Sequence, residues 1–422
     1  MGSSEKVRTR SLSTILIGTA IICLLAGGIL GYALSSFNTS SQISGLHSNV
    51  STLQKQVSDL LSANDTSSGN VTYVNSTYEN TTTTYVLGDN VSLPQLYAQV
   101  ESSVVVVQGL IAEYGFFGEL AGYATVQGSG FVSNSTGQFV IITNYHVVDG
   151  ATNITVTFVD GNTYIANVTG TDPYADLAVL TSNAPQDEYN PLTITNSSTL
   201  EVGDPVLAVG TPYGLAGTVT SGIVSALGRT ISESTSGGYD IADCIQTTTP
   251  INSGNSGGPL LNYKGEVVGI TTAIVSNSQG LGFAIPSSSI LREIQSLIVN
   301  GSYDNHPWLG ASGTDMSLGI AQVMNTNVTY GFLITSVTSG GPADKAGLRA
   351  GTTQVQIAGS SVTIGGDIIT GINGTRIRNT DDLLSYLEEN TLPGQTINVA
   401  LVRNNETLRL PLVLGVRPPP SS

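Results

Sequence analysis

The sequence predicts a mainly β protein that carries an apolar segment near its N-terminus. Short runs rich in Val, Ile and Thr recur through most of the 422 residues, and turn-forming pairs such as Thr136-Gly137 and Asp160-Gly161 separate them. Short strands at near-regular spacing are typical of a β-barrel or a β-sandwich. The apolar segment, Ile15–Leu34, is long enough to cross the ~30 Å hydrocarbon core of a membrane.

The N-terminal segments predict a single membrane anchor. Residues 1–10 carry Lys6, Arg8 and Arg10, whereas residues 11–37 carry no charge. Because basic residues stay on the cytoplasmic side, we expect a cytoplasmic tail over 1–10, an uncleaved anchor over 11–37 and an extracytoplasmic remainder. The alternative is a cleaved signal peptide, for which Ala33 offers only a weak cleavage site.

Residues 38–92 are expected to form a stalk. Its first part has apolar residues at alternating spacings of three and four, which is a short heptad pattern that could join protomers. The weak point of this interpretation is that three heptads with a glycine make a marginal coiled coil. A Ser/Thr/Asn tract over 64–90 then predicts a flexible linker. Seven of the fifteen glycosylation sequons precede residue 93, which favours a glycosylated, outward-facing stalk.

The segment after the stalk is dominated by strand patterns. A short amphipathic helix is expected at Leu93–Ala98, and apolar residues at helical spacing predict a closing helix at Ser287–Val299. Between them the expected strands are 103–108, 128–132, 139–143, 153–158, 163–168, 192–195, 205–209, 218–227, 241–247, 266–273 and 282–285.

Composition excludes several classes of partner. The formal net charge of −16 argues against binding to nucleic acid or to an anionic membrane surface. The two cysteines, Cys23 and Cys244, cannot form a disulfide framework, and the sequence has no Cys/His cluster that would indicate a metal site. No organic cofactor is implied either.

One loop, 252–260, has the composition of a nucleophile loop. It reads Asn-Ser-Gly-Asn-Ser-Gly-Gly-Pro-Leu, so that glycines flank Ser256 and a proline closes the run. Glycines allow a substrate carbonyl to approach the backbone, and the N–H groups of Gly254 and Ser256, with Asn255 shaping the turn, can form an oxyanion hole. Taken alone, the same composition also suits an ordinary hairpin turn.

A nucleophilic serine needs a base and an orienting carboxylate. Of the three histidines, only His146 lies in a patterned region, at the end of an apolar strand. Asp176 precedes the apolar run 177–180, where a carboxylate is costly to bury unless it is paired. Asp149 and Asp172 fit solvated turns better. The loop also fits the G-x-S-x-G elbow of α/β-hydrolases, which requires a helix directly after the serine and a triad histidine late in the chain. Here Gly257-Gly258-Pro259 and a strand-like run follow the serine, so the elbow interpretation fails.

Several motifs together resemble the HtrA/Deg family of serine proteases. They are Thr143-Asn-Tyr-His146, Asp172-Pro-Tyr-Ala-Asp-Leu-Ala-Val179, Thr218-Val-Thr-Ser-Gly-Ile-Val-Ser-Ala226, Gly254-Asn-Ser-Gly-Gly-Pro-Leu260 and Gly282-Phe-Ala-Ile-Pro286. The sequence departs from the family at Thr248, where an Asp is common, and at Ser253, where a Pro is common. Both flank the segment that sets substrate preference.

The resemblance implies a fold of two parts. Residues 93–303 should form a chymotrypsin-like pair of six-stranded β-barrels, with His146 and Asp176 on the first barrel and Ser256 on the second. Residues 304–418 should form an α+β PDZ domain. In it, Tyr330, Gly331, Phe332 and Leu333 are expected to be the loop that captures a peptide carboxylate, with the peptide adding a strand beside Leu333–Val337. Residues 352–363 form an insertion of unassigned role.

The resemblance also implies a function. We expect a membrane-anchored, extracytoplasmic serine endopeptidase that degrades misfolded protein and works as a homotrimer or a higher homo-oligomer. Its partners would be unfolded proteins or peptides, and its P1 pocket would take small or medium apolar side chains. The alternative is a chaperone or PDZ scaffold whose protease is dormant.

Overall fold

The computed structural model describes residues 92–115, 117–134, 136–211, 217–233, 239–252, 254–272 and 281–419. The expected cytoplasmic tail, membrane anchor, heptad segment and glycosylated linker over 1–91 therefore lie outside the described residues. Within the described residues, no helix is both long enough and apolar enough to cross a membrane.

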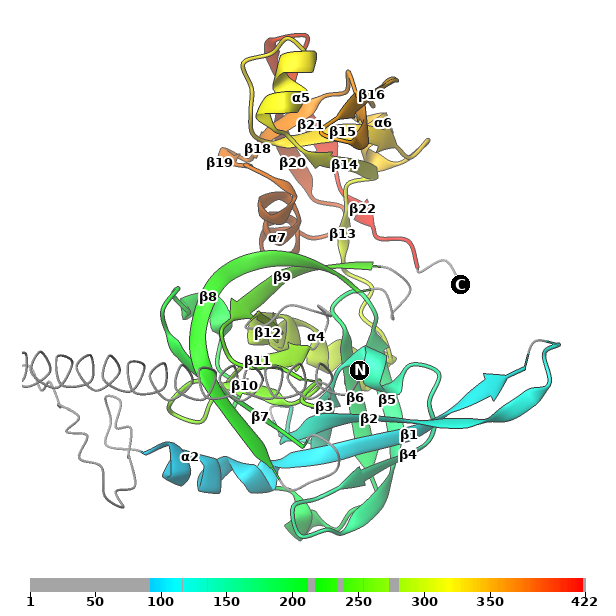
Figure 1. Ribbon diagram of the computed structural model, residues 1–422, viewed down its shortest axis with the longest axis vertical. Helices are drawn as coiled ribbons and strands as arrows, with labels where there is room; N and C mark the ends of the chain where they lie inside the picture. The colour runs from blue at the N-terminus through cyan, green and yellow to red at the C-terminus, as the bar shows by residue number, and fades with distance from the viewer. Residues whose placement is uncertain are drawn as a thin grey trace, which may run out of the picture. The chain divides into compact units, whose positions relative to one another are not determined.

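The first closed barrel has the strand order β1-β2-β3-β6-β5-β4 (Figure 1). Helix α2 (Leu93–Val100) precedes it, and its N-cap Ser92 forms a capping box with Gln95. The four consecutive valines that open β1 are buried, as expected for a barrel strand that packs on both faces. The strands of this barrel are β1 (Val104–Tyr114), β2 (Leu120–Ser133), β3 (Val140–Thr143), β4 (Thr152–Thr157), β5 (Thr163–Asp172) and β6 (Leu177–Ser182).

The second closed barrel repeats this architecture with the order β10-β11-β12-β9-β8-β7. Helix α4 (Ser287–Asn300) follows it and ends at Gly301, whose φ of 80° suits a glycine C-cap. The strands are β7 (Pro205–Gly210), β8 (Thr218–Glu233), β9 (Tyr239–Thr247), β10 (Pro259–Leu261), β11 (Val267–Thr272) and β12 (Gly282–Pro286).

A shared core joins the two barrels. Each barrel has an interior of its own, built around Val156 in the first and Leu260 in the second. A larger buried cluster includes Phe131 from the first barrel, Leu207 from the second and Ile290 from α4. Because this cluster contains residues of both barrels, the two barrels share a buried apolar contact.

The C-terminal part of the chain forms a six-stranded sheet. Five of its strands form the path β14-β15-β18-β20-β21, and β19 (Thr375–Arg376) pairs with β18. Helix α7 (Thr380–Asn390) accompanies this sheet, and its N-cap Asn379 accepts a hydrogen bond from the Asp382 N–H at 2.9 Å. The strands on the path are β14 (Ala311–Asp315), β15 (Phe332–Val337), β18 (Ile368–Ile372), β20 (Thr396–Arg403) and β21 (Glu406–Val413), with the short helices α5 (Leu318–Val323) and α6 (Pro342–Lys345) between them. A two-stranded sheet of β13 (Pro307–Trp308) and β22 (Gly415–Val416) closes the unit.

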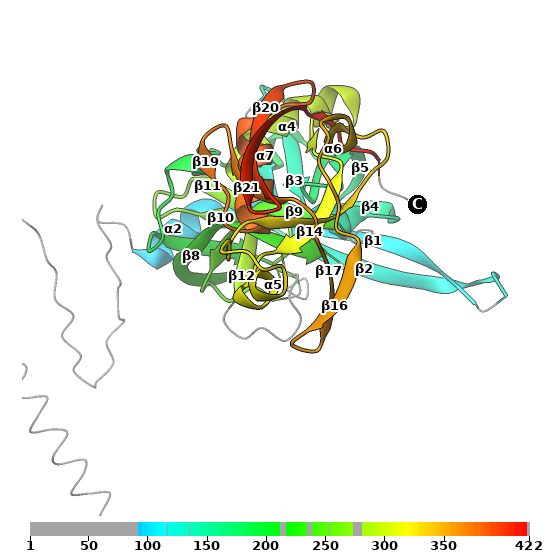
Figure 2. The same ribbon diagram turned by 90° about the horizontal axis from the view of Figure 1, so that it is seen from above.

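The structure differs from the sequence prediction in several elements, including strands β6 and β10, which are not among the expected strands. Residues 192–195 form only isolated bridges at Leu192 and Ile194 instead of a strand. The hairpin of β1 and β2 is longer than predicted and extends away from its barrel (Figure 2). The insertion over 352–363 is a hairpin of β16 (Thr353–Ile357) and β17 (Ser360–Ile364).

Helix α7 also contacts strands β8 and β9 of the second barrel. Its Asp381 carboxylate accepts hydrogen bonds from the Thr230 N–H at 2.9 Å and from Arg229 Nη1 at 3.2 Å. On the next turns of the helix, Glu388 accepts a hydrogen bond from His306 Nδ1 at 3.1 Å and lies 3.6 Å from Arg292.

Candidate active site

His146 lies on the short helix α3 (Tyr145–Val148), directly after the buried strand β3. Asn144 precedes the helix, is fully buried, and its Nδ2 donates to the Asp176 carbonyl at 2.9 Å. This bond ties the turn that carries the histidine to the turn that carries the aspartate. Sequence reasoning missed Asn144, although it belongs to the quoted Thr-Asn-Tyr-His motif.

Asp176 lies in the turn between β5 and β6, with a φ of 50° and no exposed surface. Its Oδ2 is 2.9 Å from His146 Nδ1, and its Oδ1 accepts the His146 backbone N–H at 3.0 Å. Thr272 on β11 donates a further hydrogen bond to Oδ2 at 3.2 Å. Because an ionised carboxylate only accepts, Nδ1 of the imidazole carries the proton and Nε2 is left as the basic nitrogen.

Ser256 lies in the turn between β9 and β10, and close backbone packing requires its glycines. Gly257 has a φ of 86°, and a Cβ built on it would lie 2.1 Å from the Ser129 carbonyl oxygen and 2.3 Å from Thr143 Oγ1. Its N–H donates to the Thr271 carbonyl at 2.9 Å, and the Ser256 carbonyl accepts from the Ser129 N–H at 2.7 Å. The nucleophile loop of the second barrel is therefore clamped against strand β2 of the first.

The same clamp brings Ser256 close to α3. A Cβ built on Gly128 would lie 2.7 Å from Val147 Cγ2 and 3.0 Å from the Ser256 carbonyl oxygen. Since Val147 follows His146 directly, the histidine, the aspartate and the serine are gathered at one end of the contact between the barrels. Gly128 and Ser129 are therefore part of the framework of this site. In the sequence, only the Gly128-Ser-Gly130 run indicates this role, and strand patterns alone do not separate it from the rest of β2.

The three residues expected to form the oxyanion hole differ in how far the structure describes them. The Asn255 carbonyl accepts from Thr271 Oγ1 at 2.6 Å, so the Ser256 N–H of the same trans peptide points the opposite way. Gly254 has a φ of 100°, and its carbonyl accepts from Ser129 Oγ at 2.6 Å. The Gly254 N–H belongs to the peptide shared with Ser253, which is outside the described residues.

Asp172 is not in a solvated turn, and that expectation is wrong. The residue is 1% exposed, and its Oδ2 is 2.7 Å from Nε2 of His306, which is itself buried. Burial raises the pKa of Asp172, but hydrogen bonds and the charge of His306 outweigh it and hold the pKa below its usual range. Asp172 is thus a second paired, buried carboxylate, four residues before Asp176.

The structure also corrects the expected carboxylate-binding loop. Strand β15 pairs with β14 along its length and with β18 at Phe332 and Leu333, so neither side of its first residues is free for an added peptide strand. The Gly331 N–H already donates to the Arg378 carbonyl at 2.7 Å. Tyr330 packs under the guanidinium of Arg376, 4.0 Å from ring centroid to Cζ, and Leu333 is buried.

An open groove lies instead between β14, which is an edge of the sheet, and α7. It has a volume of about 290 Å³, and Phe332 is the only residue of the expected loop that lines it. Its walls come from the strand and the segment before it on one side and from the helix on the other, with a contribution from β9. These residues include Trp308, Leu309, Ala311, Ser312, Gly313, Thr380, Leu383, Leu384, Leu387, Ala242 and Arg417.

Comparison with known proteins agrees with both parts of this architecture. Residues 128–270 match the model of the trypsin-like peptidase domain, and residues 316–414 match that of the PDZ domain. The chain is 38% identical over 292 residues to a probable periplasmic serine endoprotease DegP-like of Chlamydia trachomatis, covering 68% of this chain and 54% of that protein. The chain thus spans about half the length of the first curated relatives that it matches.

Two other relatives are covered more fully. Identity is 38% to the putative serine protease HhoA of Synechocystis, with 67% of this chain and 69% of that protein covered. It is 35% to the chloroplastic Protease Do-like 1 of Arabidopsis thaliana, with coverage of 78% and 73%.

Among solved structures, the HtrA-type protease AlgW with a decapeptide superposes with a TM-score of 0.58 at 30% identity. The alignment covers 78% of this chain and all of that one. The serine endoprotease from Yersinia pestis gives a TM-score of 0.51 at 28% identity. With two closed barrels, a PDZ domain and relatives of this identity and coverage, the chain belongs to the HtrA family of serine proteases.

Proposed function

We propose that this chain is a serine endopeptidase in which Ser256 is the nucleophile, His146 the base and Asp176 the orienting carboxylate. The observation that carries the proposal is the buried bond from Asp176 Oδ2 to His146 Nδ1 at 2.9 Å, at the contact where the second barrel presents Ser256. The relatives named above as proteases support the same activity.

The reaction follows from this arrangement. His146 Nε2 accepts the Ser256 hydroxyl proton while Oγ attacks the carbonyl carbon of the scissile bond, and it then protonates the departing amine. Asp176 keeps the Nδ1 proton in place and stabilises the imidazolium. The Gly254 and Ser256 N–H groups hold the oxyanion, and water later releases the acyl group by the same steps in reverse.

Casein cleavage tests this proposal. The wild-type chain should release casein fragments, and the Ser256→Ala variant should release none above background. Persistent cleavage by Ser256→Ala would assign the activity to another nucleophile. A chain that cleaves nothing but still suppresses casein aggregation would support the alternative of a chaperone or PDZ scaffold with a dormant protease.

We propose a P1 pocket for small or medium apolar side chains. Residues 247–252 and 271–282 contain no Asp, Glu, Lys or Arg, and Ile251 lies against Gly282, whose Cβ would fall 2.6 Å from Ile251 Cγ1. A P1 Lys or Arg would lose hydration there without gaining a counter-ion. Mass-spectrometric mapping of casein fragments should therefore show Val, Ala, Leu or Ile at P1, and a dominance of Lys or Arg would refute the assignment.

Peptide recognition is proposed for the groove between β14 and α7. A peptide can pair with the free edge of β14 and place its last side chain against Leu383 and Leu387. The AlgW structures that contain a tripeptide or a decapeptide show that such peptides bind a related protein. A peptide with an apolar C-terminal residue should bind more weakly once its carboxylate is amidated. Equal affinities of the acid and the amide would show that the carboxylate does not contribute to binding.

The surroundings of the enzyme are proposed from the sequence. We infer a single-pass anchor over 11–37, an extracytoplasmic protease over 93–303 and PDZ domain over 304–418, glycans on the stalk, and a homotrimer or higher oligomer. The support is the uncharged run, the sequons and the periplasmic relatives. Membrane extraction with carbonate, followed by mass photometry of the detergent-solubilised chain, tests the anchor and the oligomer separately.

A further inference from the structure

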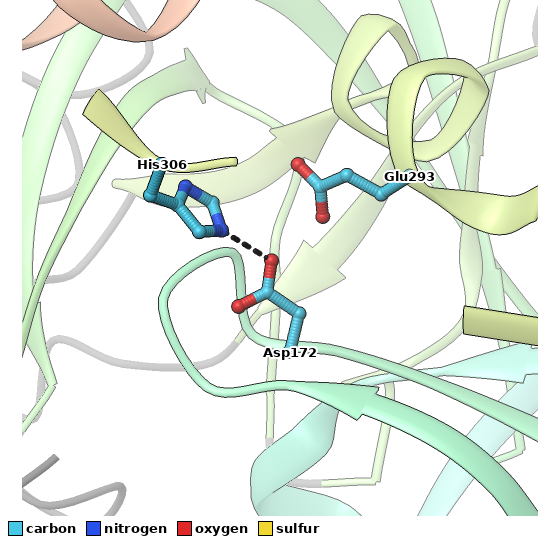
Figure 3. Close-up of side chains that lie close together, drawn as sticks. All are labelled: Asp172, Glu293 and His306. Carbon is cyan, nitrogen blue, oxygen red and sulfur yellow. Dashed lines mark hydrogen bonds and ion pairs between the residues drawn. The ribbon is translucent and has the colours of Figure 1, made fainter. Parts of the chain in front are cut away.

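A buried cluster of potential metal ligands lies outside the catalytic constellation. Asp172, Glu293 and His306 are 1%, 0% and 3% exposed, and one ligand atom from each lies within 4.8 Å of the other two. Asp172 ends strand β5, Glu293 is on the inner face of α4, and His306 precedes β13. The two carboxylates and the imidazole ring face one another (Figure 3).

The hydrogen bonds of this cluster leave one ligand atom unused. Nε2 of His306 is 2.7 Å from Asp172 Oδ2, and Oε1 of Glu293 accepts a hydrogen bond from Arg292 at 2.6 Å. Oε2 of Glu293 is buried and finds no hydrogen-bond donor among the described residues, and the nearby carboxylate of Asp172 can pair with Glu293 only through a shared proton. An unpaired buried carboxylate oxygen is costly, and such a group in a native fold indicates an ion, a water or a proton that satisfies it.

The charged groups around this oxygen have a net negative charge that two positive charges would balance. Three carboxylates, those of Asp172, Glu293 and Glu388, gather about the imidazole, and Arg292 supplies one compensating cation. With a neutral imidazole the group therefore has a net charge of −2, in a region that water barely reaches. A divalent cation would neutralise it.

We propose that Asp172, Glu293 and His306 bind a divalent transition-metal ion of the zinc class at the junction between the protease and the PDZ domain. Nε2 of His306 and one oxygen of each carboxylate are the ligands. A mixed set of one imidazole and two carboxylates suits Zn²⁺ better than Mg²⁺ or Ca²⁺, which prefer oxygen ligands alone.

The second ring nitrogen of His306 supports this assignment. Nδ1 lies 3.1 Å from Glu388 Oε2, so a metal-bound imidazole would donate its other N–H to a carboxylate, as ligating histidines usually do. A small cavity of about 10 Å³ lies on the Glu388 side of His306 and is not lined by Asp172 or Glu293, so it is not counted as part of the metal site. Metal–ligand bonds of about 2.0–2.1 Å place tetrahedral ligand atoms roughly 3.3 Å apart, so the 2.7 Å contact would open by about 0.6 Å on binding.

Zinc titration of the purified full-length chain in detergent tests the site. The measurements are zinc content after dialysis and calorimetric titration with ZnCl₂, both in a His146→Ala background that removes the catalytic imidazole as a competing ligand. One zinc per chain is expected. Glu293→Gln should weaken binding by 100-fold or more, and Glu388→Ala by about 10–100-fold because it removes the acceptor of the Nδ1 proton.

Glu266→Gln is the matched control, since Glu266 bonds to Asn262 in another turn and should leave the affinity unchanged. X-ray absorption of the zinc-loaded His146→Ala chain gives a second readout, which does not depend on whether Glu293→Gln folds. It should show a nitrogen and oxygen shell at about 2.0–2.1 Å with the scattering of a single imidazole.

The rival state fills the cluster with protons. One would reside on Glu293, whose pKa burial raises well above its usual range. The other would reside on His306, where burial lowers the pKa but the bonds to Asp172 and Glu388 raise it to about 10. Zinc absent from the His146→Ala chain, equal zinc affinity in the Glu293→Gln chain, or an absorption spectrum without imidazole would each establish the proton-filled state and overturn the metal site.

Discussion

Asp176 is held in a backbone conformation that few non-glycine residues adopt. Its φ of 50° turns the carboxylate toward α3, where the His146 side chain, the His146 N–H and Thr272 all donate to it. Left-handed backbone of this kind costs about 1–2 kcal/mol and persists where surrounding contacts fix it. The strain at Asp176 is therefore offset by the bonds that orient the imidazole of His146, the proposed base.

Asp176→Asn should preserve the fold and lower kcat by a factor on the order of 10⁴, because an amide can donate to Nδ1 and stabilise the wrong tautomer of His146. Steady-state cleavage of a casein-derived peptide measures the effect. Asp149→Asn is the control, because Asp149 is exposed and bonds only to the Tyr145 hydroxyl at 2.7 Å among its side-chain contacts described. If Asp176→Asn cleaves at the wild-type rate, another group orients the histidine.

Cys244 should not react with alkylating reagents in the native protein. It is fully buried on β9, and burial, with nearby carboxylates such as Asp243, raises the pKa of its thiol well above the usual value. In a Cys23→Ser background, iodoacetamide at pH 8 should label the chain only after denaturation. Rapid labelling of the native chain would show that β9 opens on the time scale of the reaction.

The two aspartates show what sequence alone can decide at this scale. Asp176 was identified because a carboxylate beside an apolar run needs a partner, and His146 lies only 30 positions away in a patterned segment. Asp172 was instead expected in a solvated turn, because its partner, His306, is 134 positions away in a segment with no pattern. Spacing in the sequence cannot predict such a pair, since the fold alone brings the two side chains together.

At the scale of the element, the turn that carries Ser256 depends on Gly257. Gly257→Ala should lower kcat by about 100-fold or more, because the new methyl group overlaps the Ser129 carbonyl and the loop must shift by a substantial part of an ångström. Gly137→Ala is the matched control. Gly137 has nearly the same φ, 81°, but no atom within 4 Å of the new Cβ, so only about 1 kcal/mol of backbone strain is expected.

Peptide hydrolysis and thermal unfolding, measured on both glycine variants, separate the steric effect from the conformational one. Equal losses in the two variants would mean that the positive φ, and not the contact between the barrels, is what the Ser256 turn requires.

Strand positions were largely predictable, whereas strand partners were not. The Val and Ile runs of β1, β3 and β11 are buried on both faces and are recognisable as strands without a partner. Whether β15 is an edge or a central strand depends on the pairing of β14 and β18, which lie before and after it in the chain. The peptide-binding segment was misplaced for this reason, since Gly331-Phe332 has the composition of a binding loop but a central position in the sheet.

At the scale of the whole molecule, Asp381 connects the PDZ helix to the second barrel. Asp381→Ala removes the acceptor for the Thr230 N–H and for Arg229. Because Arg229 is 46% exposed, the pair should contribute no more than about 1 kcal/mol. The contact should open about five times more often, so an added protease should cleave segment 301–305 about fivefold faster.

This measurement is made in a Ser256→Ala background, so that the chain does not cleave itself. Glu406→Ala, which removes an exposed charge at the first residue of β21, is the control and should leave the rate unchanged. An unchanged rate in Asp381→Ala as well would show that the apolar contacts of α7 hold the junction without the ion pair.

The division of the proposed catalytic residues between two barrels also sets when, during synthesis, the proposed active site can form. During synthesis the first barrel, with His146 and Asp176, emerges well before Ser256, and domains of a growing chain tend to fold as units. The serine turn reaches its final shape only against Ser129 and Gly128 of the barrel made earlier. A nascent chain cannot complete the proposed triad before its second barrel has folded on the first, because the serine turn is made last and packs against Ser129 and Gly128. In the proposed protease, the fold itself therefore delays proteolysis until both barrels have been made.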